Sequence, residues 1–129
     1  MTRSPALAAW HRIAEARDPA GLADLLAEDV VFQSPVVHAP QRGKAITLKY
    51  LTAALESLGA APDFRYVGEW HAEGSAVLNF LATIGGIEID GVDIITWNAE
   101  DKITGFKVMV RPAKGLQAVQ AAMAARLER

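Results

Sequence analysis

The hydrophobic period of this chain changes once, close to Pro62, and this change constrains the fold more than any other feature. Before Pro62, apolar residues recur at the spacing of a helix face, as they do over residues 44–58. After it, apolar and polar residues alternate in four segments up to Arg111, which is typical of half-buried strands. The order predicts an α+β fold in which helices gather on one face of a curved antiparallel sheet.

Helix start and stop signals divide the first half of the chain. The dipeptide Ser4-Pro5 places proline at the first helical position and opens a helix expected to run to about Arg17. The dipeptide Asp18-Pro19 repeats this signal for a second, shorter helix, and Gly59 supplies the stop for a third. A terminal helix is expected after Pro112.

A strand and a loop separate the second and third of these helices. Residues 30–34 predict a short strand that Pro35 ends. Residues 36–42 then form an irregular loop, because prolines bracket the segment that contains His38. This loop is a candidate rim for a site.

Each of the later strands is expected to bury one face. On the first, Phe64, Tyr66 and Trp70 are predicted to share the apolar face, and Glu69 and His71 to lie on the polar face. The remaining strands are expected near residues 78–84, 87–97 and 106–111. Short turns between them predict a meander.

One carboxylate, Asp93, interrupts the apolar face of the strand over residues 87–97. Strict alternation places it in line with Ile89, Ile95 and Trp97. Burying an acid is costly unless it is paired, hydrogen-bonded or neutralised, so we expect its pKa to lie well above the ordinary value of about 3.9. Asp93 is either an acid or hydrogen-bond donor in a ligand pocket, or a structural carboxylate paired with a backbone or indole N–H.

Composition excludes several classes of function. The chain has 129 residues, which predicts a single domain over 1–129, and its net charge of -2 argues against nucleic acid or an anionic membrane as a partner. It has no cysteine, and His11, His38 and His71 are far apart, so neither a metal site nor a cofactor is expected. No run of about 18 apolar residues occurs, and a cytoplasmic location is the default expectation.

The order of elements resembles the cone-shaped α+β fold of the nuclear transport factor 2 superfamily. Its bacterial members include SnoaL-like polyketide cyclases, ketosteroid isomerases and limonene epoxide hydrolases. The resemblance is carried by residues 18–26, residues 28–32 with Ser34-Pro35, Gly43, and residues 91–95 running on to Lys102-Ile103. It implies a cone-shaped curved antiparallel sheet, with the three helices of the N-terminal half packed on its concave face and a C-terminal helix.

The resemblance also implies an apolar cavity between sheet and helices. The residues that this chain offers as its lining are Trp10, Phe32, Tyr50, Phe64, Tyr66, Phe80, Trp97, Phe106 and Val108. The alternative is that these side chains are simply core, since aromatic and aliphatic groups fill small interiors by default.

Alignment with the ketosteroid isomerases compares three functional positions. Asp93 falls where that family keeps a protonated aspartic acid that donates to the substrate oxyanion. Ser34 stands in place of the aspartate that abstracts the proton, and Trp10 in place of the oxyanion-hole tyrosine. A serine without an activating neighbour is a poor base, and an indole cannot exchange protons. We therefore do not expect turnover of a Δ5-3-ketosteroid.

His38 is the candidate for a second catalytic group. SnoaL-like cyclases are thought to use a histidine together with an aspartate, and the loop that carries His38 is placed to reach over the cavity mouth; otherwise it is a solvated loop histidine. His11 and His71 are predicted to lie on the surface. The epoxide hydrolase activity is not expected, because no arginine lies between Arg65 and Arg111 to hold water inside the cavity.

Two classes of function remain open. The first is a cofactor-free isomerase, cyclase or lyase that acts on a small apolar carbonyl compound through Asp93, with His38 as base. The second is a non-catalytic module that binds a small apolar ligand or another protein. In either case a homodimer is expected through the outer face of the sheet, whose rows are residues 65, 67, 69 and 71 and residues 107, 109 and 111.

Overall fold

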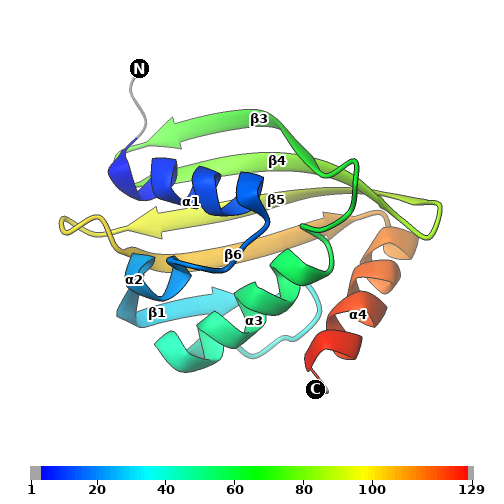
Figure 1. Cartoon of the computed structure of the whole chain (residues 1–129), viewed down its shortest axis with the longest axis horizontal. Coiled ribbons are helices and arrows are strands. Elements are labelled where there is room, and N and C mark those ends of the chain that lie inside the picture. The colour runs from blue at the N-terminus through cyan, green and yellow to red at the C-terminus, as the bar shows by residue number, and fades with distance from the viewer. Residues whose placement is uncertain (1–3, 128–129) are drawn as a thin grey trace.

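The structure is a computed structural model that describes residues 4–127. Its elements are α1 (Pro5–Ala16), α2 (Leu22–Leu25), β1 (Leu26–Gln33), β2 (Gln41–Arg42), α3 (Lys44–Glu56), β3 (Arg65–Ala72), β4 (Ser75–Ile84), β5 (Ile87–Trp97), β6 (Ile103–Arg111) and α4 (Ala113–Leu127). Figure 1 shows one curved sheet with the helices lying over the same face. The predicted α+β fold is confirmed.

The six strands form a single sheet in the order β2-β1-β6-β5-β4-β3. The meander from β3 to β6 is antiparallel, as predicted. β1 instead runs parallel to β6, with Phe32 beside Phe106, so the sheet is mixed. A parallel pair needs a long crossover connection, and here α3 and the strands β3 to β5 supply it.

The ends of the early elements follow local chemistry. Ser4 caps α1 by accepting a hydrogen bond at Oγ from the Leu7 amide, at 3.1 Å, and Pro5 fills the first turn, as predicted. β1 begins earlier than expected, because Leu26 already pairs with Ile103 of β6. The two-residue strand β2, which pairs with β1, was not predicted.

β3 departs from the predicted alternation. Its register with β4 shifts between Tyr66 and Gly68, which adds one residue to β3 and reverses the facing of the residues that follow. Trp70 therefore lies on the outer face and is 61% exposed, which corrects its predicted burial. Glu69 turns toward the helices instead, where it meets His11.

The core lies between the sheet and the helices. β4 and β5 bury alternate residues along their length, and Leu78 and Ile95 are fully enclosed. Asp93 belongs to this buried row, as predicted. No helix within residues 4–127 is both long and apolar enough to cross a membrane.

Candidate functional site

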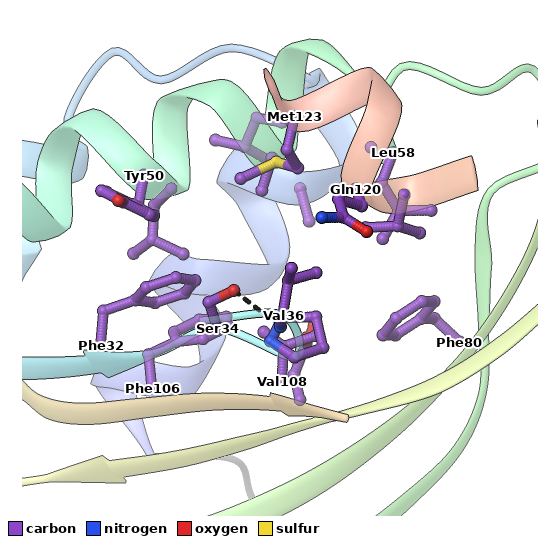
Figure 2. A pocket seen from close by; sticks show the side chains of 18 of the residues that line it. Phe32, Ser34, Val36, Tyr50, Leu58, Phe80, Phe106, Val108, Gln120 and Met123 are labelled. Carbon is purple, nitrogen blue, oxygen red and sulfur yellow. Dashed lines mark hydrogen bonds between the residues drawn. The ribbon is translucent and has the colours of Figure 1, made fainter. Parts of the chain in front are cut away.

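A cavity of about 240 Å³ lies between the concave face of the sheet and the helices α1, α3 and α4. Figure 2 shows side chains from α3 and α4 facing those from the strands across this space. From the set expected at the sequence level, the lining includes Trp10, Phe32, Ser34, Tyr50, Phe64, Tyr66, Phe80, Asp93, Phe106 and Val108. Almost all of the remaining lining is aliphatic, so Asp93 lies in an apolar environment.

A chain of hydrogen bonds leads from α1 to the buried acid. The indole Nε1 of Trp10 donates to the hydroxyl of Tyr66 at 3.0 Å. That hydroxyl donates in turn to Oδ2 of Asp93 at 2.5 Å. Three elements, α1, β3 and β5, therefore meet at the carboxyl group of Asp93, a residue that is 6% exposed.

Burial controls the protonation of this carboxyl group. Desolvation raises the pKa of Asp93 to about 7, although the hydrogen bond from Tyr66 favours the charged form and opposes the rise. Burial also raises the pKa of Tyr66 well above its ordinary value of 10, and the nearby Asp93 charge adds to this effect. Near neutral pH the carboxyl group exists in both protonation states while the phenol stays protonated.

The second carboxyl oxygen, Oδ1, is free to meet a ligand. No partner for Oδ1 is found among residues 4–127, and Asp93 is part of the cavity wall. Its neighbour along β5, Gly91, pairs with Phe80 across the sheet. A Cβ at Gly91 would lie 2.7 Å from the carbonyl oxygen of Met109 and would overlap the Phe80 ring. Glycine at this position therefore leaves room for the Phe80 ring, which also lines the cavity.

Ser34 lines the cavity at the end of β1, but its side chain is engaged in the loop. Its Oγ accepts hydrogen bonds from the backbone amides of Val36, at 3.0 Å, and Val37, at 3.3 Å. The bond to Val36 is drawn in Figure 2. Ser34 thus shapes the rim, and no base is placed against its hydroxyl among the described residues.

The structure does not bring His38 to the cavity. Residues 34–37 form a wall, and His38 lies beyond it, exposed, in a separate surface depression that Lys107 and Met109 also line. Trp97 is not part of the lining either. The register of β5 with β6 shifts between Thr96 and Trp97, and the half-buried indole packs against the core.

Sequence and structure comparisons agree on one family. A model of the SnoaL-like domain matches residues 7–106, which is most of the chain. The chain belongs to the SnoaL-like domain family. No curated protein matches this SnoaL-like chain.

Solved structures share the fold of the SnoaL-like chain, and a nuclear transport factor 2-like protein is among them. A steroid delta-isomerase from Pseudomonas aeruginosa is 38% identical, with a TM-score of 0.89 over 95% of this chain and 89% of that one. An uncharacterised protein with a cystatin-like fold from Silicibacter pomeroyi is 30% identical, with a TM-score of 0.85 over 95% and 84%. A nuclear transport factor 2-like protein of unknown function from Mesorhizobium loti shares the fold at 18% identity, with a TM-score of 0.70 over 83% and 88%.

A second polar cluster of the SnoaL-like chain lies beside the cavity. His11 is 7% exposed rather than on the surface, and its Nε2 lies 2.7 Å from Oε1 of Glu69. His71 bonds the other carboxylate oxygen of Glu69, and the rings of His11 and Tyr66 form a T-shaped pair with their centroids 5.4 Å apart. The bulge in β3 creates this cluster by turning Glu69 inward. No group of three or more such side chains among residues 4–127 is arranged to hold a metal ion.

Two functional features of the SnoaL-like chain were not predicted from its sequence. Tyr66 was expected only as lining, because nothing local to it shows that Asp93 lies within reach. A terminal helix was expected after Pro112, but no role in the cavity was predicted for it, and α4 contributes Val119, Gln120 and Met123 to the lining. The polar Gln120 within that apolar stripe was the available signal.

Proposed function

We propose that this chain binds a small apolar carbonyl compound in its cavity and acts on it as a cofactor-free isomerase, cyclase or lyase. Asp93 is the acid and hydrogen-bond donor. The observation that supports the proposal is the placement of one largely buried carboxyl group, with one oxygen held by Tyr66 and the other open to an apolar cavity.

The proposed chemistry is enolisation of the bound carbonyl compound. The neutral acid donates its proton from Oδ1 to the carbonyl oxygen while a water molecule takes the proton from the adjacent carbon. The products are the enol, the Asp93 carboxylate and hydronium, and the carboxylate regains its proton from the hydronium. Tyr66 stabilises the transient charge at Oδ2, and the Trp10 N–H orients the Tyr66 hydroxyl.

Steroid isomerisation is not part of the proposal, although the Pseudomonas aeruginosa structure carries that name. Proton abstraction from a ketosteroid calls for a fixed base. Ser34 has only a hydroxyl, which accepts hydrogen bonds from loop amides. If the wild type isomerised a ketosteroid at a rate comparable to that of a dedicated steroid isomerase, the exclusion of this activity would be wrong.

Binding without turnover is the second candidate. It is favoured by the absence of a histidine, a lysine, an arginine or a second carboxylate among the described lining residues. In that case Asp93 anchors the ligand by a hydrogen bond and transfers no proton.

One experiment separates the two candidates. 2-Tetralone, a fused two-ring ketone, is incubated in D₂O with the wild type, Asp93→Asn and Asp93→Leu, and α-proton exchange and binding are followed by NMR. The catalytic proposal expects saturable exchange with the wild type and bound but unexchanged ketone with Asp93→Asn. Binding without exchange in the wild type supports the second candidate. Absence of binding contradicts both.

We also propose that two copies pair through the outer face of the sheet, as the fold expectation suggested. The apolar residues exposed there are Val67 at 51%, Trp70 at 61% and Met109 at 49%. They flank a partly buried row of Val77 and Ile94 on the central strands. The cytoplasmic location and the single domain over 1–129 stay predictions.

A further inference from the structure

Helix α4 adds one polar side chain to a wall of the cavity that is otherwise apolar. From this helix, Val119, Gln120, Met123, Ala124 and Leu127 line the cavity. Gln120 alone among them has strong hydrogen-bonding groups in its side chain. Figure 2 shows its amide reaching from α4 into the space opposite Val36 and Phe80.

The Gln120 amide is available to a ligand. Residues 4–127 offer it no hydrogen-bond partner, and the residue is exposed, which places it at the open side of the cavity. A carboxamide donates two hydrogen bonds and accepts others, so it suits either a hydroxyl or a carbonyl group.

Most other polar groups of the lining are already engaged. The Ser34 hydroxyl accepts hydrogen bonds from loop amides. The Trp10 N–H and the Tyr66 hydroxyl already donate the two hydrogen bonds that lead to Asp93. Tyr50, from α3, is the remaining lining residue with a hydroxyl. Free polar groups therefore stand on two opposed walls, with Asp93 on the sheet and Gln120 on the helix above it.

The size of the cavity limits the ligand. Its volume of about 240 Å³ exceeds the roughly 150 Å³ of an engineered apolar cavity that holds benzene. It is smaller than the pockets of about 300–1,000 Å³ that take drug-sized ligands. This volume suits one or two rings.

We propose that the ligand is a compact one- or two-ring carbonyl compound with a second polar group, a hydroxyl or carbonyl, at the end remote from the first, and that Gln120 binds this second group. The inference rests on the proposed function, which places the first carbonyl at Asp93. A ligand that is wholly apolar at the far end strips water from the amide without replacing its hydrogen bonds, and is bound less well.

A pair of ketones tests the inference. 2-Tetralone has one polar group, and 6-hydroxy-2-tetralone adds a hydroxyl at the opposite end. Dissociation constants of both are measured by calorimetry at pH 6, for the wild type, Gln120→Leu, Tyr50→Phe and Gln117→Leu. Gln117 is the matched control, because it is an exposed glutamine of α4 that does not line the cavity.

The wild type is expected to bind the hydroxyketone about fivefold more tightly, within the range of one net hydrogen bond. Gln120→Leu should abolish this preference and leave 2-tetralone binding intact, whereas Gln117→Leu and Tyr50→Phe should keep the preference. Equal affinities in the wild type, or a preference that survives Gln120→Leu or is lost in Tyr50→Phe, overturns the inference. Failure of the proposed function gives a different result, in which neither ketone binds or Asp93→Leu leaves 2-tetralone binding unchanged.

Discussion

The protonation of Asp93 is determined by side chains that are distant from it in the sequence. Tyr66, 27 residues away, bonds one carboxyl oxygen, and the apolar cavity wall removes water from around the group. The period of the strand was enough to predict that Asp93 is buried and that its pKa is raised. It was not enough to predict the hydrogen bond, because Tyr66 reaches the acid only through strand pairing.

The free energy of unfolding should decrease as the pH rises from about 4 to about 7, because of Asp93. Its folded pKa of about 7 lies above the ordinary value of 3.8, so the fold favours the neutral acid. The stabilisation is complete below the unfolded pKa, is lost as the pH rises toward the folded pKa, and levels off above it, with a total on the order of a few kcal/mol. Urea unfolding at a series of pH values measures the effect.

Asp93→Asn should remove this pH dependence and make the protein more stable than the wild type near pH 8, since the amide is neutral and still accepts from Tyr66. Asp24→Asn, an exposed carboxylate on α2, is the control that leaves the slope unchanged. A carboxyl-carbon NMR midpoint for Asp93 at or below 4 would contradict the argument.

Tyr66→Phe should raise the pKa of Asp93 above its wild-type value. The hydrogen bond from Tyr66 lowers this pKa, so its removal leaves desolvation unopposed. The same NMR titration measures the shift. Tyr50→Phe removes another hydroxyl from the cavity wall but no bond to Asp93, and should leave the midpoint in place. An unchanged or lower midpoint in Tyr66→Phe would show that the phenol does not stabilise the charged form.

At the scale of elements, the helices and the meander follow from the sequence because each depends on local signals. Ser4-Pro5 starts α1 by capping, and alternation defines β4 and β5 without reference to distant residues. The bulge in β3 and the parallel pairing of β1 depend on which strand lies alongside. Neither leaves a clear local signal, so the facing of Trp70, and with it the burial of His11, could not be predicted.

The contact between α1 and β3 should depend on His11. His11→Phe keeps a ring against Tyr66 but removes the hydrogen bond to Glu69, and we expect the free energy of unfolding at pH 7 to fall by about 1–3 kcal/mol. His38→Phe makes the same substitution at an exposed loop position and should change it by less than about 0.5 kcal/mol. Equal unfolding midpoints in urea for the two variants would refute this.

For the whole molecule, the outer face of the sheet is the surface that a second copy would cover. Sedimentation velocity at micromolar concentration should show a dimer of the 13.8 kDa chain, and Trp70→Glu should convert it to monomer by placing a charge among apolar side chains. Gln117→Glu, on the helical side, is the matched control and should remain dimeric. A wild type that sediments only as monomer would exclude pairing by this face.

The parallel pairing of β1 with β6 has a consequence for synthesis on the ribosome. β1 is completed by Gln33, but its long neighbour in the sheet, β6, begins only at Ile103. The hairpins of the meander close locally, whereas β1 gains its long partner only when the last strand has been made. A nascent chain halted before Ile103 should therefore expose the apolar side chains of α1 and β1 to chaperones and proteases, and should gain protection only once β6 has left the exit tunnel.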